Sequence, residues 1–197
     1  MTGTAEEKTF DRQDLATEIK NYTTTDAKER AHINAFLTLL ENPRCFYRDC
    51  FPAHITGSAI LLNVKGDKIL MNHHKSLNKW LFFGGHADGE EDVLSVAIRE
   101  TMEESGITAL KPISPDFIDI DIHEIPANDK KKEPAHSHYD MRYIMQMTEE
   151  QPPVISNEST RLEWMDFDNA LSLALDDDPG MKRLLNKACH IASIPIK

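Results

Sequence analysis

The sequence predicts an α+β fold in which a mixed β-sheet is sandwiched between helices. Segments rich in β-branched and apolar residues are mixed with segments of helical periodicity, in no strict strand–helix–strand order. With 197 residues, 40% of them hydrophobic, the chain can bury a core of its own. We expect an N-terminal helical extension over residues 1–50 and one main domain over residues 51–197.

Two helices are expected within the N-terminal extension. Leu15, Ile19 and Tyr22 recur at helical spacing, and a second helix can be capped by Thr25 or Asp26. The apolar residues of this second helix are Ile33, Phe36, Leu37 and Leu40. We expect the pair to pack on the main domain or on a partner chain, so a homodimer is left open.

The main domain shows further strand and helix patterns. The turn sequence at 65–67 joins the first two strands as a β-hairpin. Gly106 ends the first helix, because glycine readily adopts the left-handed conformation found at helix ends. The expected strands are 55–64, 68–71, 80–83, 117–125, 139–147 and 161–164, and the expected helices are 92–105, 168–175 and 179–191.

The charge of the chain argues against a general nucleic-acid-binding protein. It has 22 Lys and Arg against 33 Asp and Glu, a net charge of -11. A face that binds DNA or RNA needs basic residues, and anionic lipid repels an acidic chain. We therefore expect no nucleic-acid polymer and no membrane as partner, and a phosphate ligand would need a divalent cation beside it.

The cysteines and the N-terminus favour a cytoplasmic protein. Cys45, Cys50 and Cys189 have neither the number nor the spacing of a disulfide framework or a zinc knuckle, so we expect free thiols. No apolar run approaches the roughly 20 residues of a membrane span, and the polar residues 1–14 lack an apolar secretion segment.

Three glutamates gather on one side of the helix expected at 92–105. Glu100, Glu103 and Glu104 stand at positions i, i+3 and i+4, so they share an arc of about 100°. Like charges at this spacing repel by about 0.3 kcal/mol per pair. An oxygen-ligated cation, Mg²⁺ or Mn²⁺, would remove the repulsion, whereas a solvated acidic face is the alternative for the glutamates taken alone.

The surrounding residues decide between these two interpretations. Residues 85–107 match the pattern G-x5-E-x7-R-E-U-x-E-E-x-G-U, in which U is a bulky aliphatic residue. The matching fixed positions are Gly85, Glu91, Arg99, Glu100, Glu103, Glu104 and Gly106. Chance would give this match on the order of 10⁻⁸ times per starting position. The chain therefore resembles the Nudix (MutT-like) hydrolase superfamily over residues 51–175, with Thr101 as a departure from the pattern.

The resemblance implies the Nudix fold and Mg²⁺-dependent (or Mn²⁺-dependent) hydrolysis of a pyrophosphate linkage in a nucleoside diphosphate derivative. By position, Glu100, Glu103 and Glu104 match the metal-binding glutamates of the family, and the carbonyl of Gly84 matches a backbone ligand. In such chemistry the cation activates a water molecule and a carboxylate takes its proton. We expect Glu100 to combine the duties of ligand and base.

The resemblance also implies a structural pair and leaves two rival functions. Arg99 is expected to hold Glu91 in the loop before the helix. One rival is a non-catalytic, nucleotide-sensing Nudix module, although such modules usually lose glutamates of the box. The other is an enzyme like prenyl-diphosphate isomerase, which needs a nucleophilic cysteine that the sequence does not identify. Glu158 is left open as a residue that lines the pocket.

A second polar segment follows at 133–140. If it begins a strand, His136, His138 and Asp140 share one face. The segment resembles an HxHxD element found after the box in some bacterial Nudix proteins. Three interpretations stay open: a substrate or catalytic contribution with Glu133 as a base from a late loop, a separate transition-metal site, and a polar strand face. His86 either reaches a phosphate or fills its loop.

Overall fold

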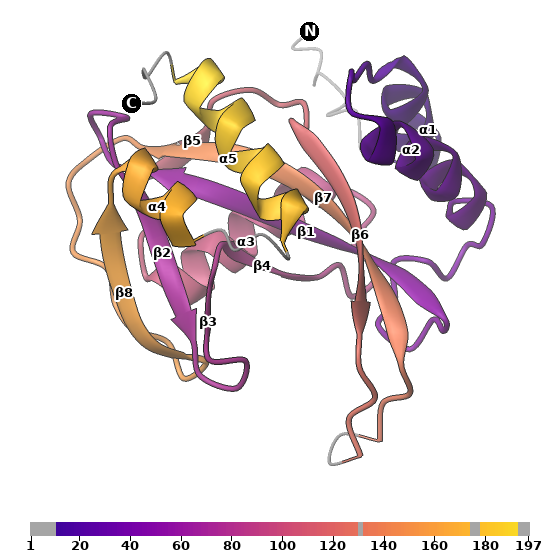
Figure 1. Cartoon of the computed structure of the whole chain (residues 1–197). Helices are drawn as coiled ribbons and strands as arrows, with labels where there is room; N and C mark the ends of the chain where they lie inside the picture. The colour runs from indigo at the N-terminus through magenta and orange to yellow at the C-terminus, as the bar shows by residue number, and fades with distance from the viewer. Residues whose placement is uncertain (1–10, 130–131, 174–177, 193–197) are drawn as a thin grey trace, which may run out of the picture.

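The computed structural model describes residues 11–129, 132–173 and 178–192, and it confirms the predicted α+β class. A curled mixed sheet has helices on both faces, with α4 and α5 on the near face and α3 on the far face in Figure 1. The strands are β1 (Ala53–Leu62), β2 (Ile69–His74), β3 (Lys79–Leu81), β4 (Phe83–His86), β5 (Leu110–Pro112), β6 (Asp119–Ile125), β7 (His136–Met147) and β8 (Ser159–Met165). The helices are α1 (Arg12–Asn21), α2 (Ala27–Leu39), α3 (Val93–Ser105), α4 (Phe167–Leu173) and α5 (Pro179–Ile191).

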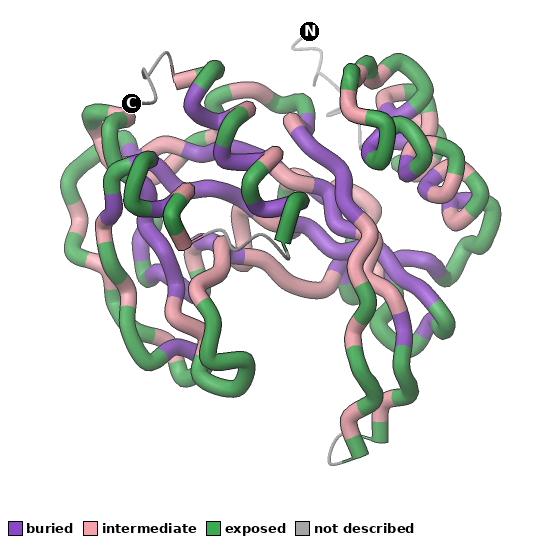
Figure 2. The backbone as a smooth tube through the Cα atoms, viewed as in Figure 1, coloured by how far each residue is buried: buried purple, intermediate pink, exposed green. Residues whose placement is uncertain are grey.

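Strand β1 is the centre of the sheet. It pairs in parallel with β7 along its whole length and antiparallel with β2 and β4. Strands β3 and β8 pair with β2, whereas β5 and β6 pair with β7. Because helices cover both faces, β1 is buried at almost every position, as Figure 2 shows for the middle of the sheet.

The side chains of β1 alternate between two cores. Ile55, Ala59 and Leu61 join the core formed with α1, α2 and α3. Ile60 and Leu62 join the core formed with α4 and α5. The face that carries Ile60 and Leu62 is polar at the start of the strand, where His54, Thr56 and Ser58 stand.

The N-terminal helices pack on the main domain, which is one of the two arrangements that we expected. Leu15, Ile19 and Phe36 are fully buried in the same core as Ile55 of β1. Asp26, one of the two expected caps, begins α2 by accepting a hydrogen bond from the backbone N–H of Glu29 at 2.8 Å. A homodimer through these helices stays a prediction.

The bounds of several strands differ from the predicted bounds. The expected strand 80–83 is split into β3 and β4, and Gly84 and Gly85 lie within β4 instead of after it. A Cβ atom at Gly84 would overlap Ser58 of the adjacent β1, so glycine permits the close approach of the two strands. Strand β7 begins three residues earlier than expected, and β5 was not expected.

A network of buried charges, which the sequence pattern does not indicate, joins α2 and α5 to β6 and β7. Glu29 is fully buried and accepts hydrogen bonds from the Nζ of Lys187 at 2.6 and 2.7 Å. Asp119, also fully buried, accepts from Nε of Arg183 at 2.6 Å. The members of the network are Glu29, Asp119, Asp121, Asp140, Arg142, Arg183 and Lys187.

Two expectations drawn from composition can be compared with the fold. The three cysteines are free, as predicted, and the structure shows that they are also buried. Among the described residues, no helix has both the length and the apolar character that crossing a membrane requires.

Glu18 of α1 gives the fold a testable pH dependence. Burial, followed by the charge of Asp116 and a hydrogen bond to it, raises the pKa of Glu18 from 4.5 to about 7. A pKa raised by folding means that the stabilisation from the protonated acid is complete below pH 4.5 and is lost as the pH rises through 7. After allowance for solvent screening, we expect Glu18→Gln to increase the free energy of unfolding by about 1 kcal/mol near pH 8 and to change it little near pH 4.

Urea denaturation at the two pH values measures this difference. The exposed Glu41→Gln variant is the matched control, for which we expect no pH-dependent gain. An equal gain from Glu18→Gln at both pH values would show that ionisation of Glu18 is not the cause.

Candidate active site

Helix α3 lies against β4 and carries the acidic residues. Asp92 begins the helix by accepting a hydrogen bond from the backbone N–H of Ser95, and Gly106 ends it in the left-handed conformation with φ of 71°. Both ends agree with the predicted helix. Thr101, the departure from the box pattern, is fully buried, and its Oγ1 donates to the carbonyl of Ala97 at 2.7 Å. Its hydroxyl is thereby satisfied inside the core.

Glu104 is a buried carboxylate, with 9% of its surface exposed. Its Oε2 accepts a hydrogen bond from the backbone N–H of Gly84 at 3.2 Å. Burial raises the pKa of Glu104 to about 8, and the charges of Glu100, Glu158 and Glu103 add to the rise against the opposing Gly84 hydrogen bond. Glu104 therefore lies in a negative field, to which Glu158, which the sequence left open, contributes.

Glu100 lies against the second glycine of β4. A Cβ atom at Gly85 would overlap the carboxyl group of Glu100, so glycine is what lets this side chain occupy its place. Burial raises the pKa of Glu100, although Arg99 Nη1 donates to its Oε1 at 2.5 Å. Glu103 differs from both, since 62% of its side chain is exposed and its Oε2 lies 3.7 Å from Arg99 Nη1.

The expected pairing of Glu91 with Arg99 is wrong for this structure. Besides Glu100, the guanidinium of Arg99 donates to the backbone carbonyl of His86 at 2.9 Å. Glu91 instead accepts a hydrogen bond from the backbone N–H of Arg12, also at 2.9 Å. Arg12 begins α1, where unpaired N–H groups favour a carboxylate. Glu91, in the loop before α3, therefore binds the first turn of α1, and Arg99 binds the last residue of β4 through its backbone carbonyl.

The residue types at this place are those that bind a divalent cation. Glu100, Glu103 and Glu104 come from one helix, and the carbonyl of Gly84 belongs to the strand against which that helix packs. Carboxylates and backbone carbonyls are the donors that Mg²⁺ and Mn²⁺ prefer. Two of the three glutamates have pKa values raised by burial, and a cation would offset that cost.

Comparison with known proteins decides the family. The family model described as the NUDIX domain matches residues 52–188. The chain belongs to the Nudix family. Among its curated relatives is the "Probable DHNTP pyrophosphohydrolase" of Lactococcus lactis subsp. cremoris, with 31% identity over 139 residues, which are 71% of this chain and 81% of that protein. This Nudix protein is therefore a hydrolase acting on acid anhydrides.

Solved structures confirm the Nudix fold. A C. elegans Ap4A hydrolase in a binary complex matches with a TM-score of 0.55 and 22% identity, over 71% of this chain and 97% of that chain. The E. coli dihydroneopterin triphosphate pyrophosphohydrolase matches with a TM-score of 0.53 and 15% identity, over 68% and 92%. At such identities the likeness shows the fold alone.

The structure gives Asp140 a role inside the sheet. This buried carboxylate accepts hydrogen bonds from Thr56 Oγ1 at 2.9 Å, Ser58 Oγ at 2.7 Å and Arg142 Nε at 2.9 Å. Three donors occupy its oxygen atoms, which leaves little capacity for a substrate. The expectation that it acts together with the neighbouring histidines is therefore not supported by its contacts.

Glu133 lies in the turn of the β6–β7 hairpin. Its backbone pairs with that of Asn128 across the turn. Its charge, together with that of Glu100, helps to raise the pKa of Arg48, for which the hydrogen bond to Asp88 is the largest cause. The charges of Glu133 in the hairpin turn and of Glu100 on α3 therefore both reach Arg48. A role for Glu133 as a base stays a prediction.

His136 and His138 meet histidines that the sequence did not connect with them. The β1–β7 register places His54 opposite His138, and the ring centre of His54 lies 4.9 Å from those of both β7 histidines. His86 of β4 lies 5.1 Å from His54. Burial lowers the pKa of His54, that of His86 to about 4 and that of His138 to about 2, so these rings are neutral near pH 7.

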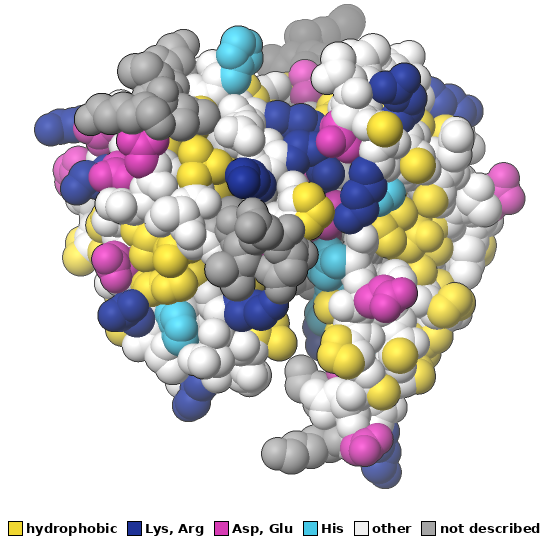
Figure 3. All heavy atoms as spheres, in the orientation of Figure 1, with side chains coloured by type: hydrophobic (Ala, Val, Ile, Leu, Met, Phe, Trp, Pro, Cys, Tyr) yellow, Lys and Arg dark blue, Asp and Glu magenta, His cyan; other side chains and the backbone are white. Residues whose placement is uncertain are grey.

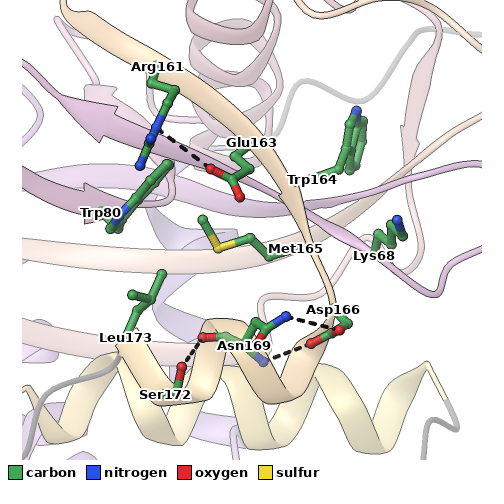
Figure 4. Close-up of a pocket in the computed structure, with 10 residues that line it drawn as sticks. All are labelled: Lys68, Trp80, Arg161, Glu163, Trp164, Met165, Asp166, Asn169, Ser172 and Leu173. Carbon is green, nitrogen blue, oxygen red and sulfur yellow. Dashed lines mark hydrogen bonds and ion pairs between the residues drawn. The ribbon is translucent and has the colours of Figure 1, made fainter.

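A separate pocket of ≈ 400 Å³ lies beside β8 and α4 (Figure 4). The guanidinium carbon of Arg161 lies 4.8 Å from the ring centre of Trp80, and Arg161 Nε lies 3.6 Å from Glu163. None of the residues labelled in Figure 4 belongs to the Nudix box, so we do not assign this pocket to the hydrolysis of anhydrides.

Proposed function

We propose that this Nudix hydrolase cleaves the pyrophosphate linkage of a nucleoside diphosphate derivative with the help of Mg²⁺ or Mn²⁺. Glu100, Glu103, Glu104 and the carbonyl of Gly84 would hold the cation. The observation that carries the proposal is the environment of Glu104, which is buried, accepts a hydrogen bond from a backbone N–H, and has three acidic neighbours that raise its pKa. A carboxylate in that environment gains most from a cation.

The residues of the chain have distinct parts in the proposed reaction. When bound, the cation polarises the phosphoryl oxygens and lowers the pKa of a water molecule. Glu100 accepts the proton of the attacking water, because its raised pKa suits a base that works near neutral pH. Arg99 positions Glu100 through their 2.5 Å hydrogen bond, and Gly85 leaves room for the Glu100 carboxylate.

The cysteines bear on the rival function of an enzyme like prenyl-diphosphate isomerase. Burial raises the pKa of Cys45 to about 12 and that of Cys189 to about 11, and Cys50 is also buried. A nucleophilic cysteine needs a lowered pKa and access to its substrate. This environment favours hydrolysis over the isomerase-like function.

A hydrolysis screen tests the proposed function. The panel contains nucleoside diphosphate derivatives together with the compounds that the names of the similar proteins suggest, dihydroneopterin triphosphate and Ap4A. Each compound is incubated with Mg²⁺, with Mn²⁺ and with a chelator, and the products are identified by chromatography. We expect cleavage of a P–O–P linkage in at least one compound, with no turnover in the chelator.

The same panel separates the hydrolase from the nucleotide-sensing alternative. Calorimetry measures the binding of each compound in the presence of Mg²⁺. Tight binding of a nucleotide with no turnover under any metal condition would contradict the hydrolase and support the sensor. The absence of polymer or membrane partners stays part of the proposal and is supported by the net charge of -11. A cytoplasmic location also stays part of the proposal.

A further inference from the structure

Five histidines lie on one face of the sheet, and one of them belongs to the strand that carries Gly84 and Gly85. They come from four adjacent strands: His86 of β4, His54 of β1, His136 and His138 of β7, and His123 of β6. We call these five residues the histidine cluster. Figure 3 shows histidine atoms in cyan along the furrow beside the projecting β6–β7 hairpin.

The register of the strands explains why these side chains meet. His138 pairs with His54 on one side and with His123 on the other, so the three share a face. His86 pairs with Thr56, which is two residues from His54 and therefore on the same face. The carboxyl group of Glu100 lies against Gly85, whose neighbours on β1 face the opposite core, so Glu100 and the histidine cluster lie on opposite faces of the sheet.

The nitrogen atoms of three members of the cluster lie close enough to one another to be candidate ligands of one metal ion. One ring nitrogen from each of His54, His86 and His138 lies within 4.8 Å of the others. The Nε2 atoms of His136 and His138 are 3.3 Å apart. Tetrahedral zinc with Zn–N bonds of about 2.0–2.1 Å holds its ligand nitrogens roughly 3.3 Å from one another.

Two of the rings are already oriented through their other nitrogen. Nδ1 of His136 lies 2.8 Å from the carbonyl of Pro134, and Nδ1 of His54 lies 3.3 Å from the carbonyl of Cys50. A carbonyl only accepts hydrogen bonds, so each Nδ1 carries the proton and each Nε2 is left to accept a hydrogen bond or to bind a metal ion. Histidines that bind metals typically donate their second nitrogen to a backbone carbonyl in this way.

His54 distinguishes a metal site from a simple stack of rings. The residue is 1% exposed, and its Nε2 has no hydrogen-bond partner among the described residues. An unpaired polar atom in the interior costs about 1–3 kcal/mol. Ring stacking leaves the lone pair of Nε2 without a partner, whereas a metal ion between the rings would accept it.

We propose that the histidine cluster binds one divalent transition-metal ion of the zinc class through ring nitrogens of His54, His86, His136 and His138. Imidazole ligands favour zinc, copper, nickel and iron, whereas the oxygen set on α3 favours Mg²⁺ or Mn²⁺. The bound ion would link β4, which carries Gly84 and Gly85, to β1 and β7. His123, with 41% of its side chain exposed, lies beside His138 outside the ligand set.

Cobalt titration of the full-length protein, purified without a histidine tag and stripped with a chelator, tests the proposal. We expect binding of one Co²⁺ per chain with the visible absorption of a four-coordinate ion. Zn²⁺ should displace the Co²⁺, and a large excess of Mg²⁺ should leave it bound. Less than one equivalent of Co²⁺ bound, or displacement by Mg²⁺, would overturn the proposal.

Matched variants locate the ion within the protein. His54→Gln and the less buried His86→Gln should each weaken Co²⁺ binding at least tenfold, whereas the exposed His190→Gln should bind as the wild type does. Circular dichroism verifies that each variant is folded, and His86→Gln suffices if His54→Gln is not. Glu104→Gln should retain the cobalt spectrum. Loss of the spectrum in Glu104→Gln, or wild-type binding by His86→Gln, would contradict the site.

Discussion

Replacing Glu104 with glutamine is expected to lower kcat by about 100- to 1,000-fold and to leave the protein folded. The amide oxygen of glutamine can still accept the hydrogen bond from Gly84, but it offers no negative charge to a cation. Because burial raises the pKa of Glu104 to about 8, losing its ionisable group should not reduce the melting temperature. The Glu104→Gln variant should therefore lose activity without losing stability.

Steady-state kinetics on the best substrate and a thermal melt measure the two effects. Glu103→Gln should also lower kcat. Because the side chain of Glu103 is exposed, this substitution should not disturb the fold. The matched control is Glu149→Gln, which makes the same change at an exposed position outside the box. Wild-type turnover in both box variants would show that the glutamates do not hold the catalytic cation.

Replacing Arg142 with methionine should cost about 3–5 kcal/mol in the free energy of unfolding. The side chain of Arg142 is only 11% exposed, and its guanidinium lies 2.9 Å from Asp140, 3.2 Å from Asp121 and 3.4 Å from Asp119. Methionine fills part of the space but leaves these carboxylates short of a cation inside the protein. A buried charge that loses its partner is strongly destabilising.

Urea denaturation of the Arg142→Met variant provides the measurement. Arg44→Met is the matched control, because Arg44 pairs with Asp49 where both side chains are more than half exposed. Exposed ion pairs contribute about 0–1 kcal/mol, so the control should stay close to the wild type. A loss from Arg142→Met as small as that of the control would mean that the buried network contributes little to stability.

The parts of the structure that sequence predicted well are those set by local chemistry. Helix α3 was predicted because apolar residues recur at helical spacing and Gly106 permits the left-handed end, and the structure adds Asp92 as its N-terminal cap. The box glutamates could be placed on one side of that helix from the helical period alone. The Nudix fold followed from the same residues, and the comparisons confirm it.

The parts that sequence missed depend on pairing between distant segments. His54 meets His138 only through the parallel β1–β7 register, which cannot be read from the sequence because 83 residues separate the two histidines. Glu91 binds the start of α1 instead of Arg99, because the packing of that helix cannot be read from the box. The charged residues of the buried network, such as Glu29 on α2, look like ordinary surface charges in an amphipathic helix.

Manganese binding to the box glutamates is the most direct test of the proposed cation site. Electron paramagnetic resonance can measure free Mn²⁺ during titration of the wild type and of Glu104→Gln, each first loaded with one equivalent of Zn²⁺ and given a non-hydrolysable diphosphate analogue. A Mn²⁺ affinity at least tenfold weaker in Glu104→Gln is the result we predict. Equal affinities in the two folded proteins would contradict the assignment of the catalytic cation to these glutamates.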